Sequence, residues 1–413
     1  MHKQKVCVIG LGYIGLPTAA LLATNGYEVV GVDVSEHAVD MINQGQIHIV
    51  EPDLDAFVRA AVFSGKLKAY QSPQAGDIYI ICVPTPFHEG QAIPQPNIDY
   101  VMKAARSIAP FIKTGDLLIL ESTSPVGTTQ SIAQELGHAG VDVSTIDIAY
   151  CPERVLPGKI MTELVANDRV VGGLTPKATK VVAQFYKTFV RGSVLETDAK
   201  TAEMCKLTEN SFRDVNIAFA NELSIICANQ GIDVWNLIQL ANRHPRVNIL
   251  QPGTGVGGHC IAVDPWFIIA KDPENTPLMR TAREVNNHKT EWVIEKVISA
   301  AKKVNLSPGI KPKVACLGLS FKPDIDDLRE SPAVQVALAL ESQGIEVLAV
   351  EPNIDAHERF NLIGLDDALK TADVIAVLVK HHQFVDDDCK KNLAKFGALD
   401  FCGLGLDSTI VGN

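Results

Sequence analysis

A glycine-rich turn near the start of the chain constrains the fold more than any other feature of the sequence. Val6 to Ile9 form a short apolar run of the kind that builds buried parallel strands. Gly10, Gly12 and Gly15 follow it as G-x-G-x-x-G, and a helical segment comes next. In this order the glycines permit a tight turn, a close approach of phosphate to backbone, and close helix–strand packing. The pattern therefore predicts a strand–turn–helix unit that binds a dinucleotide.

Asp33 indicates which dinucleotide this unit binds. It ends a second predicted strand, residues 28–33, and lies 18 residues after Gly15. A carboxylate at this position can hydrogen-bond both ribose hydroxyls of NAD, and it would repel a 2′-phosphate. We therefore predict NAD rather than NADP as the cofactor. On these residues alone, a glycine turn without a ligand stays possible.

The rest of the chain alternates between strand-like and helical segments, which predicts parallel sheets covered on both faces. The fold predicted is α/β, with two Rossmann-like doubly wound parallel-sheet domains joined by a helical central region that contains a long helix. A loop rich in Gly and Pro, residues 244–265, interrupts the helical region. The predicted domains are residues 1–196, 197–305 and 306–413, with strands at 78–83, 117–120, 146–150, 314–319, 344–350 and 374–379 and helices within 197–241 and 278–304.

Composition and charge exclude several classes of protein. Of the 413 residues, 46% are hydrophobic and 21% are charged, which is typical of a globular chain that buries its core without disulfides. The net charge of −11 argues against nucleic acid or an anionic membrane as a partner. No apolar run approaches the ~18 residues of a membrane helix, and the start has no signal-peptide pattern. We therefore expect a cytoplasmic protein.

The nine cysteines do not suggest a metal site or a disulfide framework. Their number is odd and no two are spaced C-x-x-C, so we expect no bound metal and mostly buried thiols. Cys260 differs because it ends the glycine-dense stretch that begins at Gly253, and Asp264 follows shortly after. Dense glycine suggests that the backbone closely approaches another group, so Cys260 is a candidate nucleophile. A structural cysteine beside a flexible loop is the alternative.

A polar stripe on the central helix could support such a nucleophile. Lys206, Asn210 and Arg213 are spaced i, i+4 and i+7, which places them within about 60° of one another on one helix face. Asn is a poor choice for an exposed helix interior, although a solvated helix edge would also fit. If this stripe faces Cys260, Lys206 could favour the thiolate or stabilise a developing oxyanion.

Further polar residues follow predicted strands, where doubly wound sheets bind ligands. Thr85, Thr123 and the pair Glu153–Arg154 each come after a different strand of the first domain. In the last domain, Lys322 and Arg329 follow the first strand and could hold a phosphate. For the residues of the first domain the alternative is ordinary loop capping, and for Lys322 and Arg329 it is a solvated charged loop. NAD together with a nucleophilic cysteine suggests oxidation of an aldehyde through a thioester that water hydrolyses.

At this point the chain is recognisable as a relative of a known family. It resembles the UDP-glucose/GDP-mannose dehydrogenases over nearly its whole length. The segments that carry the resemblance, in order, are Gly10–Gly15, Ser122–Gly127, Cys151–Arg154, Lys206–Asn210, Gly257–Cys260 and Phe321–Pro323. The resemblance implies a four-electron oxidation of a primary alcohol to a carboxylate, with two NAD used in turn. It also implies an NAD domain at the start, a UDP-sugar domain at the end, and a homodimer or larger oligomer built by the central helix.

The resemblance also narrows the substrate. Residues 201–221, 242–248 and 261–267 are particularly similar to the bacterial members of the family that act on UDP-N-acetyl-D-mannosamine. His259 and Val263 stand where members that act on UDP-glucose typically carry Ser and Lys. We therefore expect C6 oxidation of UDP-N-acetyl-D-mannosamine to its uronate, in the supply of a bacterial surface polysaccharide. The gluco epimer is the alternative substrate.

The resemblance also implies a role for individual residues of this chain, each at a position that matches the family pattern. Cys260 would be the nucleophile; Lys206, Asn210 and Asp264 would position water or stabilise the oxyanion; Glu153 and Thr123 would assist. Arg246 would come from the neighbouring subunit. The NAD contacts expected are Gly10, Gly12, Tyr13, Ile14, Gly15, Asp33, Thr85, Thr123, Thr129 and Arg329. The UDP-sugar contacts expected are Arg154, Val155, Lys206, Asn210, Arg213, His244, Arg246, Gly257 and Lys322.

Two other classes of protein fit the sequence less well. A UDP-sugar epimerase or dehydratase of the short-chain type uses Tyr-x-x-x-Lys, and none of the seven tyrosines is followed by Lys at that spacing. A non-catalytic sensor of NAD or UDP-sugar would have no need for Cys260, Lys206 and Asn210 together.

Overall fold

The computed structural model describes residues 4–88, 90–91, 93–258, 260–305, 307 and 309–406. The chain divides into two compact units. The first unit contains residues 1–209 and 266–271, and the second contains residues 210–265 and 272–413. His259, which the resemblance singled out as a difference from the UDP-glucose enzymes, lies outside the described residues.

The first unit is built on the predicted strand–turn–helix start. β1 (Lys5–Ile9) leads into α1 (Gly15–Thr24), which leads into β2 (Glu28–Val32). β1 lies between β2 and β4 in an eight-stranded sheet of order β10-β9-β8-β7-β4-β1-β2-β3. The other strands of this sheet are β3 (Leu67–Tyr70), β4 (Ile78–Ile81), β7 (Leu117–Leu120), β8 (Asp147–Tyr150), β9 (Arg169–Gly173) and β10 (Val194–Asp198).

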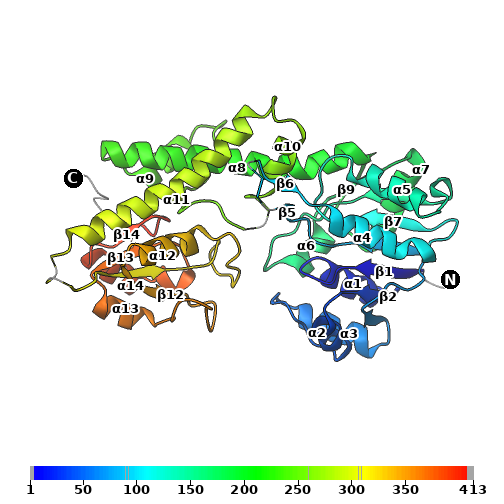
Figure 1. Cartoon of the computed structure of the whole chain (residues 1–413), viewed down its shortest axis with the longest axis horizontal. Helices are drawn as coiled ribbons and strands as arrows, with labels where there is room; N and C mark the ends of the chain where they lie inside the picture. Colours follow the sequence, from blue (N-terminus) through cyan, green and yellow to red (C-terminus); the bar gives the residue numbers. More distant parts are fainter. Residues whose placement is uncertain are drawn as a thin grey trace. The chain divides into compact units, whose positions relative to one another are not determined.

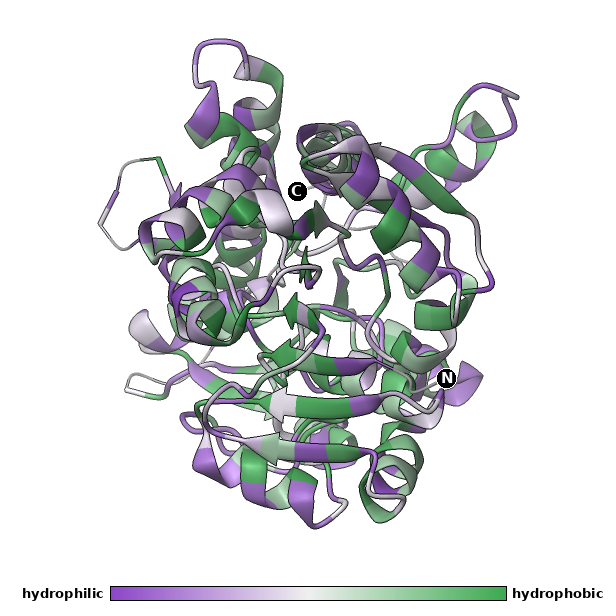
Figure 2. Cartoon of the chain, turned by 90° about the vertical axis from the view of Figure 1, so that its right-hand side faces the viewer, coloured by the Kyte–Doolittle hydropathy of each residue, from purple (hydrophilic) through white to green (hydrophobic). Residues whose placement is uncertain are grey.

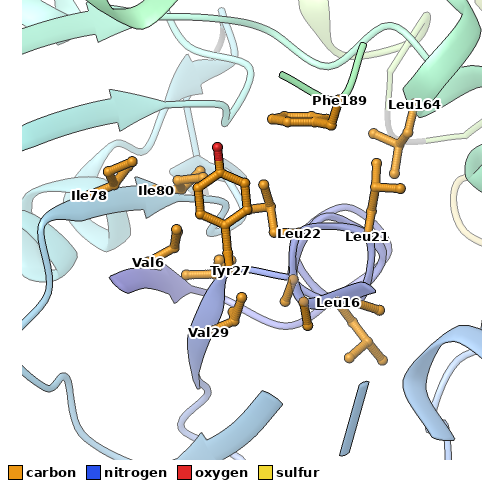
Figure 3. Close-up of a cluster of buried hydrophobic side chains, with 14 of the residues drawn as sticks. Val6, Leu16, Leu21, Leu22, Tyr27, Val29, Ile78, Ile80, Leu164 and Phe189 are labelled. Carbon is orange, nitrogen blue, oxygen red and sulfur yellow. The ribbon is translucent and has the colours of Figure 1, made fainter. Parts of the chain in front are cut away.

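Helices cover both faces of this sheet, which confirms the doubly wound prediction. Val6 and Val8 of β1 point into one core, while Cys7 and Ile9 point into the core on the other face. Figure 3 shows the first core, where Val6, Ile80 and Leu22 lie around the Tyr27 ring. Hydrophobic colour covers most of the length of the sheet strands in Figure 2. The first face is covered by α1, α3 (Leu54–Phe63), α6 (Ile160–Ala166) and α7 (Pro176–Tyr186), and the second by α4 (Asp99–Ile108) and α5 (Thr128–His138).

One edge of the sheet is not parallel. β9 runs antiparallel to β8, and β10 is parallel to β9, so these two strands oppose the direction of the other six in the described sheet. An antiparallel edge on an otherwise parallel sheet is common in large α/β domains. The smaller elements of this unit are α2 (Glu36–Asn43), η1 (Ala109–Phe111), η2 (Val143–Thr145) and the short ribbon of β5 (Phe87–His88) and β6 (Gln95–Pro96).

The predicted long helix is α8 (Ala199–Gln230), the longest helix of the described chain (Figure 1). It is followed by α9 (Val234–Ala241), α10 (Asp264–Lys271) and α11 (Pro277–Lys303). In the second unit, buried polar pairs join α8 to α11. Arg283 donates to Asp214 at 2.7 Å, and Asn221 donates to Asn286 at 2.9 Å.

The second unit contains the other predicted sheet. Its four strands are all parallel, in the order β12-β11-β13-β14. Alternate residues of β11 again enter two cores, one with α11 and α12 and one with α13 and α14. The bounds are β11 (Lys313–Leu317), α12 (Pro332–Ser342), β12 (Glu346–Val350), α13 (Leu365–Thr371), β13 (Val374–Val377), η3 (His382–Phe384), α14 (Asp387–Lys395) and β14 (Leu399–Asp400). Among the described helices, none combines the length and the apolar character that crossing a membrane requires.

Candidate active site

The glycine turn of the first unit has the geometry of a dinucleotide site. Gly10 has a φ of +90°, and a Cβ there would lie 2.8 Å from the Cys82 carbonyl oxygen. A Cβ on Gly15 would collide with the Gly10 carbonyl, so glycine lets α1 begin against the strand. A Cβ on Gly12 would meet only open space. Open space above the turn is where a pyrophosphate approaches the backbone in such sites, so the turn fits NAD.

Asp33 is fixed beside this turn. Its carboxylate accepts hydrogen bonds from the backbone N–H of Leu11 and of Ser35, both at 2.9 Å. Two neighbouring residues were not predicted from the sequence. Val34 is 94% exposed, which is unusual for a large hydrophobic side chain. His48 has a lowered pKa because burial disfavours its charged form, with Asp33 and the Leu11 backbone acting in the opposite direction.

The predicted polar residues gather at the carboxyl ends of β4, β7 and β8. The Thr85 hydroxyl, after β4, donates to the Thr123 carbonyl at 2.6 Å. The Ser122 hydroxyl, after β7, donates to the Val83 carbonyl at 2.7 Å. Because neighbouring parallel strands end at one edge, these loops bring Thr85 and Thr123 together, as the strand positions suggested.

Glu153, after β8, occupies a buried environment that suits acid–base chemistry. Burial raises its pKa to about 7, although Lys206 and Arg169 favour the ionised form. Its Oε1 atom is buried and has no hydrogen-bond partner among the described residues. The loop that carries it is fixed by Glu51, whose carboxylate accepts from the N–H groups of Gly158 and Ile160. A carboxyl group that titrates near neutral pH can both take up and release protons.

Arg154 and Thr129 already have partners within the first unit. The Arg154 guanidinium pairs with Glu209 of α8 at 2.7 Å and donates to the Asp168 carbonyl. Thr129 is fully buried, and its N–H and hydroxyl both donate to Glu203 of α8. Glu203 also accepts from the Gly127 N–H, so this carboxylate occupies the N-terminus of α5. The predicted ligand roles of Arg154 and Thr129 stay predictions.

The segment that ends at Cys260 is anchored inside the second unit. The Gly253 N–H donates to Asn221 of α8 at 3.0 Å, and the Thr254 hydroxyl donates to the Leu378 carbonyl at 2.6 Å. The Gly258 N–H donates to the Arg329 carbonyl at 3.1 Å. Three anchors within six residues give a defined conformation to a stretch that has neither helix nor strand.

Gly257 shows why this stretch is rich in glycine. A Cβ at this position would collide with the Glu330 carbonyl oxygen and would lie 2.7 Å from Cδ of Pro332 and 2.9 Å from Cβ of Phe321. The backbone therefore lies directly against the turn that precedes α12. Cys260 comes three residues later, is half-buried and forms no disulfide.

The structure brings together three of the predicted catalytic residues in the second unit and two in the first. In the second unit, Asn210 Nδ2 donates to the Asp264 carboxylate at 2.5 Å, and the Asp264 N–H donates to the Cys260 carbonyl at 2.8 Å. In the first unit, Lys206 is buried and lies close enough to Glu153 to favour its ionised form. Lys206 and Asn210 are one turn apart on α8.

The turn after β11 repeats the geometry of the dinucleotide turn. Gly318 has a φ of +87°, and its N–H donates to the Val350 carbonyl at the end of β12. Glu351 holds the position of Asp33 and accepts from the N–H groups of Leu319 and Ser320. Burial would raise the Glu351 pKa, but hydrogen bonds from His381 and these amides lower it to about 2. This turn therefore presents the same backbone frame to a second nucleotide.

Other predicted ligand residues lie at or near the surface. Arg329 is exposed and forms a bidentate pair with Asp327, with a shortest distance of 2.6 Å. Lys322, Tyr13, Ile14 and Val155 are half-buried, whereas Arg213, His244 and Arg246 are exposed. Their ligand roles stay predictions.

Several buried polar residues escaped the sequence analysis. Arg169, Glu203 and Asn221 are at most 2% exposed, and Glu203 and Asn221 lie far along the chain from the groups they contact. Glu121 directly precedes the Ser122–Gly127 segment that carries the family resemblance, but the sequence indicated no role for it. A charged residue at the start of an otherwise apolar strand, as Arg169 is in β9, is the one local signal that could have identified such a position.

Two doubly wound sheets, one with a turn shaped for NAD, define an NAD-dependent oxidoreductase with a second nucleotide-binding domain. Residues 4–190 match the NAD binding domain of the UDP-glucose/GDP-mannose dehydrogenase family, residues 200–288 its central domain, and residues 315–402 its UDP binding domain. The chain belongs to this family. It is therefore a dehydrogenase with NAD as its cofactor.

Individual relatives show how close the similarity is. The chain is 55% identical over 402 residues to UDP-N-acetyl-D-mannosamine dehydrogenase of Escherichia coli, covering 93% of this chain and 95% of that one. It is 54% identical over 395 residues to NDP-N-acetyl-D-galactosaminuronic acid dehydrogenase of Ralstonia nicotianae, covering 92% of each. A solved structure of UDP-N-acetyl-mannosamine dehydrogenase from Staphylococcus aureus superposes with a TM-score of 0.84 at 45% identity, covering 92% of this chain and 90% of that one.

Proposed function

We propose that the protein oxidises the C6 hydroxyl of UDP-N-acetyl-D-mannosamine to a carboxylate, with two NAD used in turn. The observation that carries this proposal is the 55% identity over 402 residues to an enzyme of that specificity. The polar groups at the strand ends of the first unit and the anchored Cys260 segment of the second support it. Both are arrangements that a covalent dehydrogenase needs.

The proposed cofactor site consists of the glycine turn and its neighbours. The Gly10–Gly15 turn would hold the pyrophosphate and Asp33 the adenosine ribose, while the exposed Val34 would lie against the adenine. Thr85 and Thr123 would hold the nicotinamide half at the strand ends. NAD supplies the hydride acceptor in both half-reactions.

In the first half-reaction, the C6 hydroxyl gives up its proton to Lys206 or to a water that Lys206 orients. Loss of a hydride from C6 leaves an aldehyde. The Cys260 thiolate adds to the aldehyde carbon, and the thiohemiacetal formed loses a second hydride to become a thioester. Asn210, held by Asp264, and Lys206 would donate hydrogen bonds to the oxyanion that develops in these steps.

Hydrolysis completes the reaction. Glu153, with a pKa of about 7, takes a proton from the attacking water, and the C–S bond breaks to release the carboxylate and the thiolate. The alcohol, two NAD⁺ and one water thus yield the carboxylate, two NADH and three protons. Thioester hydrolysis is strongly favourable, so it draws the unfavourable alcohol oxidation forward.

The UDP-sugar would be held by the residues that the family resemblance implies. Among them, Arg154 and Val155 follow β8 and Arg213 lies on α8. Arg154 would keep its pairing with Glu209 and present its remaining N–H groups. The lysine and arginine side chains would pair with the diphosphate.

The test is to offer single UDP-sugars with NAD and to count the NADH formed per sugar. We expect about two NADH from UDP-N-acetyl-D-mannosamine, since each oxidation step releases one. Turnover of only the gluco or only the galacto epimer would refute the manno specificity. The galacto arm is included because the Ralstonia relative is nearly as similar. A ratio near one would refute the four-electron reaction.

We also propose that the protein forms a homodimer through α8. Phe212, Phe219 and Ile226 are spaced by seven residues on one helix face and are 67%, 51% and 42% exposed. A stripe of this period suits packing against a second helix of the same kind. Arg246, which is exposed, would then reach the site of the partner copy. Sedimentation should give a dimer for the native chain and a monomer for Phe219→Asp; a native monomer would refute the proposal.

A further inference from the structure

Glu153 and Arg169 lie near the antiparallel edge of the large sheet, Glu153 in the loop after β8 and Arg169 at the start of β9. Ala149 of β8 pairs with Gly173 of β9, and Tyr150 pairs with Gly172. The loop after β8 stays beside the start of β9, because Asn167 Nδ2 donates to the Arg154 carbonyl at 3.0 Å and the Arg154 guanidinium donates to the Asp168 carbonyl at 3.1 Å. Cys151 of this loop and Val171 of β9 belong to the same core.

Both side chains contain buried polar atoms that lack a partner among the described residues. Arg169 is 2% exposed, and its Nε and Nη1 atoms make no hydrogen bond there; Nη2 donates weakly to the Leu164 carbonyl at 3.4 Å. Glu153 Oε1 is also buried and unpaired within the same part of the chain. A buried guanidinium without a counter-ion is costly, and nearby carboxylates offset part of this cost.

A second carboxylate completes the cluster from the other side. Glu121, directly after β7, is 2% exposed and accepts a hydrogen bond from the Tyr186 hydroxyl at 2.5 Å. The Arg169 guanidinium lies over the Tyr186 ring, 5.5 Å from its centre. Burial would lower the Arg169 pKa, but Cys151, Glu121, Tyr186 and Glu153 raise it, so Arg169 stays charged.

We propose that Arg169 is a positioning residue that holds Glu153 in its ionised, proton-accepting form, and that Glu121 limits this effect. The proposal rests on the proposed function, in which Glu153 is the base for thioester hydrolysis. The charged groups that face Glu153 are Lys206 of α8, Arg169 of β9, Glu121 after β7 and Glu163 of α6. Two of these groups are cations and two are carboxylates, so the protonation state of Glu153 depends on the balance between their opposing charges.

This balance predicts opposite shifts of the Glu153 pKa when Arg169 and when Glu121 loses its charge. Burial raises the Glu153 pKa, Lys206 and Arg169 lower it, and Glu121 and Glu163 raise it. Removing the Arg169 charge should therefore raise this pKa, and removing the Glu121 charge should lower it. A purely structural role for either residue would change activity at all pH values without moving the midpoint of the pH profile.

The experiment compares the pH dependence of overall turnover, at saturating UDP-sugar and NAD, for Arg169→Gln and Glu121→Gln. The acidic limb of the native profile should disappear in Glu153→Gln. Its midpoint should move upward by about one pH unit in Arg169→Gln and downward in Glu121→Gln. Arg169→Lys keeps the charge and Tyr186→Phe keeps every charge, so both should leave the midpoint near its native position.

Unmoved midpoints, or midpoints that move in one direction in both variants, would overturn the proposal. Should Arg169→Gln fail to fold, Glu121→Gln carries the test alone: a downward shift supports the proposal and no shift overturns it. Failure of the proposed function is separate, because the native enzyme would then make no NADH from any UDP-N-acetylhexosamine. In that case, infrared titration of the Glu153 carboxyl, assigned with Glu153→Gln, makes the same comparison without turnover.

Discussion

Replacing Gly257 by Ala should separate the position of Cys260 from the stability of the fold. The added Cβ would collide with the Glu330 carbonyl oxygen and approach Pro332 and Phe321. A backbone carbonyl and a proline ring cannot rotate away, as the end of a flexible side chain could. Overpacking of this kind typically costs about 1–3 kcal/mol once neighbouring atoms have moved, so we expect the segment itself to shift.

A shift of this segment changes activity more than stability. Cys260 is three residues from Gly257, and a displacement of about 1 Å in a reacting group can cost roughly 100-fold in rate. We therefore expect Gly257→Ala to lose about 100-fold in turnover while its melting temperature falls by only a few degrees. NADH formation at saturating substrates and a thermal melt measure the two effects.

Gly253→Ala is the matched control within the same segment. The nearest heavy atom to a Cβ there is the Gly255 carbonyl oxygen at 3.8 Å, and the N–H that binds Asn221 is kept. This variant should differ from the native enzyme by no more than about 0.5 kcal/mol in stability or activation energy. Native turnover in Gly257→Ala, or an equal loss in Gly253→Ala, would show that close packing of the segment does not position Cys260.

Three further predictions concern single buried or anchored groups. Lys289 is 3% exposed, and burial lowers its pKa from 10.5 to about 7, so protonation opposes folding. Lys289→Met should stabilise the protein by up to about 3 kcal/mol at pH 7, after about 1 kcal/mol is deducted for the lost bond to Ser224. The stabilisation by Lys289→Met should fade between pH 7 and 10.5, because in that range the native fold binds fewer protons than the unfolded chain and so gains stability as pH rises. Thermal melts across this pH range measure the effect, and a Lys289→Met variant less stable than the native protein at pH 7 would contradict the prediction. Glu203→Ala removes three hydrogen bonds from the start of α5 and should cost about 2–3 kcal/mol in urea unfolding, whereas a loss below about 0.5 kcal/mol would refute this capping role. Asp33→Asn should lower the ratio of kcat/KM for NAD to that for NADP by about tenfold or more, and an unchanged ratio would contradict the ribose assignment.

Local signals in the sequence predicted the parts of the fold that depend on near neighbours. The apolar run, the glycine spacing and Asp33 define β1, the turn and β2, because each contact lies within about thirty residues. The direction of β9 could not be predicted, since the apolar pattern of a strand does not specify which way it runs. Strand direction nevertheless sets the start of β9, with Arg169, beside the loop that carries Glu153.

In the candidate site, too, contacts that follow from strand ends or from the family resemblance could be predicted, and contacts between distant parts of the chain could not. The ends of β4, β7 and β8 placed Thr85 near Thr123, and the contact between Asn210 and Asp264 agrees with the grouping that the family resemblance implied. Glu203, by contrast, reaches Thr129 from 74 residues away. Its spacing on α8 resembles that of any buried helical residue, so no local pattern could have indicated its partner.

The covalent bond between Cys260 and C6 of the sugar is the central claim, and mass spectrometry of enzyme quenched during turnover tests it directly. With UDP-N-acetyl-D-mannosamine and NAD present, we predict a peptide containing Cys260 with the mass of the acylated thiol, which should be absent without NAD. Cys260→Ala should form no uronate, although it can still form NADH in the first half-reaction. Uronate formed at the native rate by Cys260→Ala, or turnover without a Cys260 adduct, would contradict the account.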